Sequence, residues 1–255
     1  MNQSVTFLGS MMLDIYRPEL KARYGEKYKG EYSAEWTKQR LDFFHSWTLK
    51  SLRNQTFKDF TILMFCREES REIIESYMWD ENIRHCYDRG KQALSEIDTE
   101  FVSITRMDTD DLFRFDLMEK VAENFSETKR YKRLLFSDYY SWLFHHGVFI
   151  HRLDPLREDR LKKWSPSYTL IAPTGIDVDK KWFLWPPDMC KRPYRVIGSD
   201  MVLDIKAEGS THYSIWDKQA REDRTCRIHV LRSKRDGHEI IGDREIQLKI
   251  LEDFL

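Results

Sequence analysis

Residues 105–111, Thr105-Arg106-Met107-Asp108-Thr109-Asp110-Asp111, directly follow the apolar run Phe101-Val102-Ser103-Ile104. The run predicts a buried strand. Acids at its end would lie at the carboxyl edge of a sheet, where open α/β folds bind their ligands. In an extended chain Asp108 and Asp110 would point the same way and could share one divalent cation, because such ions prefer carboxylate oxygens. The stretch therefore predicts an α/β fold with a metal-nucleotide site.

A second interpretation of the same acids stays open. Residues 112–125 are amphipathic, and acidic residues ahead of a helix cap its free N–H groups and complement its dipole. Asp110 and Asp111 would then be N-terminal helix residues only. A calcium-binding EF-hand loop is excluded, because the segment lacks the glycine at the sixth position and the distal glutamate.

Composition limits the class of protein. The chain has 255 residues, of which 41% are hydrophobic and 33% charged, with a formal net charge of −1. This is enough for one domain with a core, and the balanced charge gives no argument for nucleic acid or an anionic membrane as a partner. The four cysteines, Cys66, Cys86, Cys190 and Cys226, form no CxxC pair, so neither a zinc site nor a disulfide scaffold is indicated. Without a run of eighteen apolar residues or a basic leader, we expect a soluble cytoplasmic protein with no transmembrane segment.

Hydrophobic periodicity predicts alternating strands and helices. Strands are expected at residues 4–12, 61–65, 83–87, 101–105, 131–136, 146–151, 168–172 and 211–216, with the fifth and sixth as an antiparallel pair. Helices are expected at residues 33–54, capped by Ser33, and at residues 71–79, 90–97, 114–125 and 244–255. The strand, helix, strand order at the start predicts a right-handed parallel crossover. Residues 14–33 form a long polar loop that would lie beside the nucleotide pocket.

A family resemblance appears when two segments are taken together. The first is Ser51-Leu52-Arg53-Asn54-Gln55-Thr56 followed by Asp59-Phe60 and a strand, and the second is the acidic run 105–111. Together with the α/β order between them, they resemble nucleotide-sugar glycosyltransferases of the GT-A fold. The pairing of Arg with DxDD is most similar to the rhamnosyltransferase family. The resemblance covers the chain to about Pro173.

The resemblance implies a fold and separate binding roles for the two halves of the chain. The fold would be a single GT-A-like α/β domain over residues 1–255, with a mostly parallel central sheet flanked by helices and a loop-rich C-terminal acceptor region. Residues 1–125 would bind the nucleotide sugar and residues 126–255 the acceptor.

It also implies roles for individual residues. Asp108 would face the ribose or the cation, and Asp110 would ligate a Mn²⁺ or Mg²⁺ ion that bridges the donor diphosphate. Asp111 is assigned to the substrate site together with Arg106 and Asp108. It would orient the other two acids or cap the helix, and Arg106 would hold the donor or form an intramolecular ion pair. His212 is the first candidate for a further metal ligand, with His229 and His238 as rivals.

An inverting transferase also needs a carboxylate that takes the proton from the acceptor hydroxyl. Asp200 is favoured by its spacing from the DxD motif in related folds, and the other candidates are Asp177, Asp179 and Asp204. A retaining enzyme would need no such base. Trp182, Trp185 and Trp216 could stack on acceptor sugars or belong to the core.

We therefore expect a metal-dependent glycosyltransferase, with rhamnose as the sugar that the family name suggests. Its partners would be a nucleoside-diphosphate sugar and a glycan or lipid-linked acceptor, as in polysaccharide biosynthesis. The alternatives are a metal-dependent nucleotidyltransferase or phosphohydrolase, and a non-catalytic nucleotide- or sugar-binding protein of the same fold.

Overall fold

The computed structural model describes residues 4–14, 33–88, 90–125, 133–135, 139–141, 149–151, 168–175, 194–198, 201–205, 239–241 and 243–255. Apart from its first and last residues, the expected loop at residues 14–33 lies outside these ranges. The expected strand at residues 211–216 lies outside them completely. The site residues Asp200 and His212 lie outside them as well.

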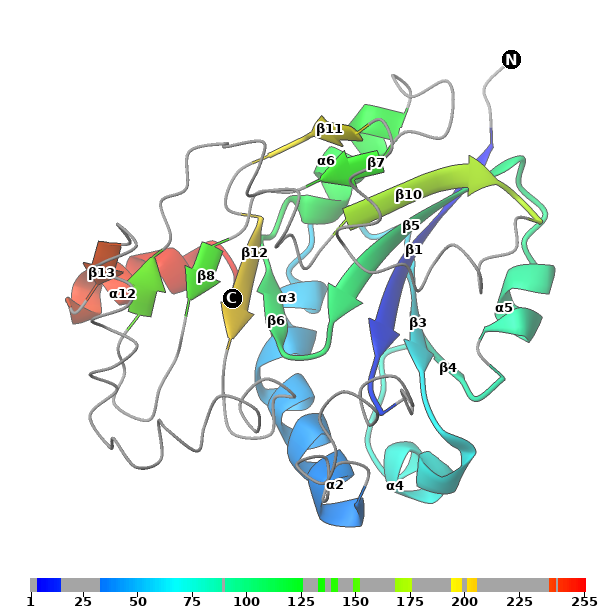
Figure 1. Cartoon of the computed structure of the whole chain (residues 1–255), viewed down its shortest axis with the longest axis horizontal. Helices are drawn as coiled ribbons and strands as arrows, with labels where there is room; N and C mark the ends of the chain where they lie inside the picture. The colour runs from blue at the N-terminus through cyan, green and yellow to red at the C-terminus, as the bar shows by residue number, and fades with distance from the viewer. Residues whose placement is uncertain are drawn as a thin grey trace, which may run out of the picture.

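A seven-stranded sheet forms the centre of the molecule, in the order β11-β7-β10-β5-β1-β3-β4 (Figure 1). Its strands are β1 (Val5–Met12), β3 (Thr61–Phe65), β4 (Ile83–Cys86), β5 (Phe101–Asp108), β7 (Arg133–Leu135), β10 (Tyr168–Pro173) and β11 (Tyr194–Val196). β1 pairs in parallel with both β3 and β5, and β10 runs antiparallel between β5 and β7. The predicted α/β class with a mostly parallel central sheet is confirmed, and it agrees with the GT-A-like fold that the resemblance implies.

Helices cover both faces of this sheet, because its strands carry apolar side chains on both sides. One face packs against a long helix, made of α2 (Ala34–Phe43), a π-helical turn η2 (Phe44–Thr48) and α3 (Leu49–Arg53), and against α4 (Arg71–Glu75) and α6 (Leu117–Phe125). The other face packs against α5 (Lys91–Ser95). Gly9 fits between the layers because a Cβ atom there would lie 2.3 Å from Ile62 Cδ1.

The long helix begins where the sequence predicts. The Ser33 side chain accepts a hydrogen bond from Trp36 N, so it caps the helix. The crossover from β1 through this helix to β3 joins two parallel strands, as predicted. The π-helical turn in its middle was not predicted. Such turns often lie at functional sites.

A smaller layer lies beside the main sheet (Figure 1). It contains the sheet β6-β12-β8, with β6 (Asp111–Phe113), β12 (Val202–Ile205) and β8 (Tyr139–Ser141), and the pair β13-β9, with β13 (Glu239–Ile241) and β9 (Phe149–His151). A separate apolar cluster joins it to α12 (Arg244–Glu252) through Leu112, Leu203, Ile241 and Phe254. Asp111, the last acid of residues 105–111, is the first residue of β6 and therefore belongs to this layer.

Four predictions about elements are wrong. Residues 131–136 and 146–151 do not pair with each other, because β7 joins the main sheet and β9 pairs with β13. The helix predicted at residues 71–79 is shorter than expected, because α4 ends at Glu75. A short 3₁₀ turn, η3 (Glu68–Ser70), precedes it. The helix expected from residue 114 begins at Leu117, and the strand expected to end at residue 105 continues to Asp108.

Candidate functional site

The three acids of residues 108–111 lie where β5 leaves the main sheet. Asp108 is the last residue of β5 and pairs in register with Met12, the last residue of β1. Asp110 lies in the turn that follows, and Asp111 is the first residue of β6. The acids are therefore at the carboxyl edge of parallel strands, as predicted, but the chain turns at Thr109 and Asp110 instead of continuing extended.

This geometry corrects the interpretation that Asp110 and Asp111 are N-terminal helix residues. Asp111 does not cap a helix, because it starts a strand and α6 begins six residues later at Leu117. The Asp111 side chain is 2% exposed. Its remaining predicted role, orienting the other acids, stays a prediction, and so does its assignment to the substrate site.

Asp108 and Asp110 lie beside arginines from different elements. Arg106 Nη2 is 3.2 Å from Asp108 Oδ1, in keeping with the side-chain alternation that places residues 106 and 108 on one side of a strand. Arg40 Nη2, on α2, is 3.8 Å from Asp110 Oδ1. Asp108 is 30% exposed and Asp110 17% exposed, so both carboxylates reach solvent. The intramolecular ion pair considered for Arg106 is present.

The turn at Thr109 and Asp110 is held by the long helix. Arg40 Nη2 donates a hydrogen bond to Thr109 Oγ1, and Thr48 Oγ1 donates to Thr109 O at 2.9 Å. Thr109 Oγ1 in turn donates to Met12 O at 3.5 Å, at the outer limit of a hydrogen bond. Arg40 lies in α2 ahead of the π-helical turn, and Thr48 is the last residue of that turn. Sequence reasoning did not assign Arg40 to the site, although an arginine within the apolar stripe of this helix was a usable signal.

Arg106 lies between β1 and β10 in the sheet. Its register partners are Ser10 and Tyr168, and its guanidinium carbon is 6.0 Å from the centre of the Tyr168 ring. Burial lowers the pKa of Arg106, but the charge of Asp108, its hydrogen bond to the guanidinium and the further interactions with Tyr168 and Asp111 outweigh burial and raise the pKa above its ordinary value. Arg106 therefore provides a permanent positive charge next to Asp108.

The other half of the motif, residues 51–56, holds the segment that follows the acids. Gln55 is fully buried, and its Nε2 atom donates to Ser51 O, Phe113 O and Arg114 O at 3.2, 3.3 and 2.8 Å. Its Oε1 atom accepts from Met118 N at 3.0 Å, which satisfies an N–H group in the first turn of α6. We call Ser51, Gln55 and Thr56, with the groups they bind in residues 113–119, the Gln55 cluster.

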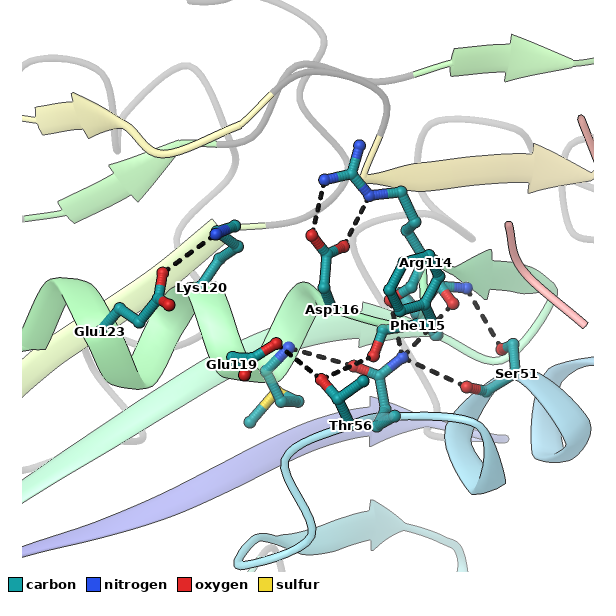
Figure 2. Close-up of polar contacts among 11 residues, drawn as sticks. Ser51, Thr56, Arg114, Phe115, Asp116, Glu119, Lys120 and Glu123 are labelled. Carbon is teal, nitrogen blue, oxygen red and sulfur yellow. Dashed lines mark hydrogen bonds and ion pairs between the residues drawn. The ribbon is translucent and has the colours of Figure 1, made fainter. Parts of the chain in front are cut away.

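Figure 2 shows the rest of this cluster. Ser51 Oγ accepts from Phe113 N at 3.2 Å, Thr56 N donates to Phe115 O at 2.8 Å, and Thr56 Oγ1 donates to Glu119 Oε2 at 2.9 Å. Beside it, Arg114 and Asp116 form a two-bond ion pair at 2.6 and 2.8 Å. Residues 51–56 therefore contact the segment that directly follows the acids, about sixty residues later in the sequence, and they fix the position of that segment.

Asp14 is a further acid at the same edge of the sheet that sequence reasoning did not single out. Its carboxylate is fully buried and accepts from Arg67 N at 2.8 Å, from Arg67 Nε at 3.3 Å and from Ser70 Oγ. These contacts tie the end of β1 to the turn after β3. Burial, and next the charge of Asp14, raise the pKa of the neighbouring Cys66 thiol, so that thiol is not an activated nucleophile.

A cation at this edge would have to be held jointly with a substrate. Among the described residues no group of three or more His, Cys, Asp or Glu side chains is arranged to hold a metal ion. Mg²⁺ is usually bound by one or two carboxylates together with substrate phosphates and water. Asp108 and Asp110, both partly exposed, can supply that pair of carboxylates. The metal prediction itself remains a prediction.

Most of the candidate bases, metal-binding histidines and acceptor-stacking tryptophans predicted in the C-terminal half lie outside the described ranges. These are Asp200, Asp177, Asp179, His212, His229, His238, Trp182, Trp185 and Trp216. Asp204 is an exception, because β12 places it as the register partner of Asp111 in β6. A candidate base thus lies on the strand directly beside the acidic segment. In the part of the chain that is described, each helix is too short or too polar to cross a lipid bilayer.

Comparison with known proteins gives two distant likenesses in structure. No family model and no curated protein matches the chain. A nucleotide-diphospho-sugar transferase from Desulfovibrio desulfuricans G20 is 11% identical with a TM-score of 0.34, over 79% of this chain and 82% of that one. The inositol-1-phosphate CTP transferase from T. maritima is 11% identical with a TM-score of 0.36, over 84% of this chain and 95% of that one. At these scores, the assignment to the α/β class rests on the strand order and strand directions of the sheet itself.

Proposed function

We propose that this protein is a metal-dependent glycosyltransferase that moves a sugar from a nucleoside-diphosphate donor to a hydroxyl group of a glycan or lipid-linked acceptor. One observation carries the proposal. Asp108 ends a central strand at the carboxyl edge of the sheet, and Asp110 follows in the adjoining turn, both with solvent-accessible carboxylates. Open α/β sheets bind their ligands at this edge. Rhamnose is the sugar suggested by the resemblance to the rhamnosyltransferase family.

Each residue of the acidic segment then has a role. Asp108 and Asp110 hold Mn²⁺ or Mg²⁺, which when bound stabilises the negative charge of the leaving diphosphate. Arg106, charged and next to Asp108, offers a guanidinium to a donor phosphate. Buried Asp111 orients the turn from its position on β6. His212 is our candidate for a further metal ligand.

The acceptor hydroxyl must lose a proton as it attacks the anomeric carbon in an inverting reaction. We propose Asp200 as the carboxylate that takes this proton. Asp204, the register partner of Asp111, is the alternative, because its backbone lies beside the acidic segment. Replacing Asp200 and Asp204 by Asn, one at a time, distinguishes the two candidates. Only the variant that lacks the base should lose sugar transfer while it still binds the donor.

Isothermal titration of Mn²⁺ with a panel of nucleoside diphosphates tests the proposal. The Asp110→Asn variant should lose Mn²⁺-dependent nucleotide binding by at least about 100-fold, because one of two charged ligands becomes neutral. Asp80→Asn is the matched control. Asp80 is 27% exposed and paired with an arginine, but it precedes β4 at the opposite, amino edge of the sheet. Equal binding by wild type and Asp110→Asn would contradict the proposal.

Product analysis separates the alternative activities. A glycosyltransferase releases a nucleoside diphosphate, whereas a nucleotidyltransferase releases pyrophosphate and a phosphohydrolase releases phosphate. Nucleotide binding without any of these products across a broad acceptor panel would assign a non-catalytic role. Each result leaves a distinct product pattern that chromatography of the nucleotide pool resolves.

A further inference from the structure

Trp79 is the centre of a cluster of aromatic rings between the long helix and β4. Measured between ring centres, it lies 5.7 Å from Phe44 and 4.8 Å from His45, both in the π-helical turn η2, and 4.4 Å from His85 in β4. The Trp79 indole nitrogen also donates a hydrogen bond to Ile74 O at 2.8 Å, near the end of α4. The segment between α4 and β4 is therefore attached to the long helix through this ring.

The two histidines that contact Trp79 are placed to be neutral. In both His45 and His85 the Nε2 atom is buried and has no hydrogen-bond partner among the described residues. A neutral imidazole needs a donor N–H on only one nitrogen, whereas a protonated one has an N–H group on each. A buried donor without an acceptor is costly, and more so when it carries a charge. Protonation of either ring would therefore disfavour its present position.

The charged groups that face His45 do not compensate a proton on its ring. Asp80 accepts two hydrogen bonds from Arg53, at 2.6 and 2.7 Å. Asp42 Oδ1 accepts from the Tyr77 hydroxyl at 2.7 Å, and the Tyr77 ring stacks on the imidazole with centres 5.1 Å apart. Burial, and next the charge of Arg53, lower the pKa of His45, and they outweigh the two carboxylates, which raise it. Both acids are already bonded to other groups.

The surroundings of His85 are similar. Glu75 Oε1 accepts from Arg71 Nη1 at 3.1 Å, and the Arg71 guanidinium carbon lies 3.8 Å from the centre of the Tyr87 ring. The Tyr87 ring centre is 6.3 Å from that of His85, and the Tyr87 hydroxyl is also buried without a hydrogen-bond partner among the described residues. Burial is the largest influence on the pKa of His85 and lowers it, with Arg71, against the charge of Glu75.

We propose that His45 and His85 form an acid-sensitive latch, which holds Trp79 and the segment between α4 and β4 on the long helix while both rings are neutral and releases the segment when they are protonated. Because the pKa of each histidine is lower in the folded protein than its ordinary value of 6.5, the stability that the latch contributes is complete above pH 6.5. It is lost as the pH falls below that value. This property of the fold is independent of the activity proposed above.

Hydrogen exchange of the full chain, measured by mass spectrometry and corrected for the intrinsic effect of pH on amide exchange, tests the latch. The amides of Ser76 and Tyr77, which bond Ile73 O and Ile74 O, should lose protection between about pH 7.5 and about pH 5.5. The double variant His45→Phe/His85→Phe keeps two rings beside Trp79 but cannot take up a proton, so this loss should be absent. Unchanged protection in wild type at the lower pH, or the same loss in the double variant, would overturn the proposal.

A single exposed residue provides a second test that does not disturb the ring cluster. Arg53→Met removes a positive charge near His45 and frees Asp80, so the pKa of His45, followed by NMR titration of its ring protons, should rise from a value below 6.5. Arg84→Met is the matched control, because it removes an exposed arginine paired with Glu96 and should leave the titration unchanged. A wild-type His45 that titrates at or above 6.5, or no rise in Arg53→Met, would contradict the latch.

Discussion

The two ends of residues 108–118 are held in opposite ways. The Gln55 cluster binds the later end through neutral, buried hydrogen bonds, and Gln55 itself has no exposed surface. At the earlier end, Asp108 and Asp110 face guanidinium groups and remain 30% and 17% exposed. A buried neutral network fixes a position and is costly to disturb. The carboxylates at the earlier end are charged and still reach solvent, so under the proposed function the later end sets the position of the segment and the earlier end binds the ligands.

The largest effect on stability is expected from replacing Gln55, which tests whether the Gln55 cluster fixes the later end of the segment. Gln55→Ala leaves buried carbonyl groups of Phe113 and Arg114 and the N–H group of Met118 without their partner, so we expect a loss of about 3 kcal/mol in the free energy of unfolding. Urea denaturation followed by circular dichroism measures it. Gln92→Ala removes an exposed glutamine bonded to Glu96 and serves as the control, with little change expected. A loss below about 1 kcal/mol for Gln55→Ala would mean that the cluster does not fix the segment.

A second variant tests whether every acid at this edge of the sheet takes part in ligand binding. Asp14 has no exposed surface and accepts from Arg67 and Ser70, so Asp14→Asn should cost about 2 kcal/mol in the free energy of unfolding. The same variant should bind Mn²⁺ and nucleotide as wild type does at a temperature where it is folded. Asp110→Asn should show the reverse, a loss of binding with little loss of stability. If Asp14→Asn also abolished binding, the division between structural and ligand-binding acids would fail.

The sequence predicts the central strands better than the smaller layer. β1, β3, β5 and β10 were expected from runs of apolar residues, which mark strands buried on both faces, and β4 was expected at residues 83–87. β6 was missed because its three residues pair with β12, about ninety residues later, and an acid followed by an amphipathic run indicates a helix start equally well. Local pattern carries no information on such a distant pairing.

The site was predicted in part for the same reason. The placement of the acids after a buried strand follows from local sequence and is confirmed, although that strand continues to Asp108 instead of ending at residue 105. The contacts of Arg40 with Thr109 and Asp110 join residues about seventy apart and depend on how the long helix packs. Gln55 was noticed only as part of a family motif, although its role is to bind backbone groups of residues 113–118. A buried polar residue at a helix end signals such a network, but not its partner.

The smallest expected effect comes from the neighbour of Gln55 in the same motif. Thr56 is exposed, and its hydroxyl donates to Glu119 Oε2 at 2.9 Å, while its backbone N–H bonds Phe115 O in any variant. Thr56→Val should therefore cost only about 0.5 kcal/mol in the free energy of unfolding, because water replaces the lost hydrogen bond. Thr56→Ser keeps the hydroxyl and should match wild type in the same urea titration. Should Thr56→Val prove as costly as Gln55→Ala, burial would not be what separates the two residues, and the cluster would act through its hydrogen bonds wherever they lie.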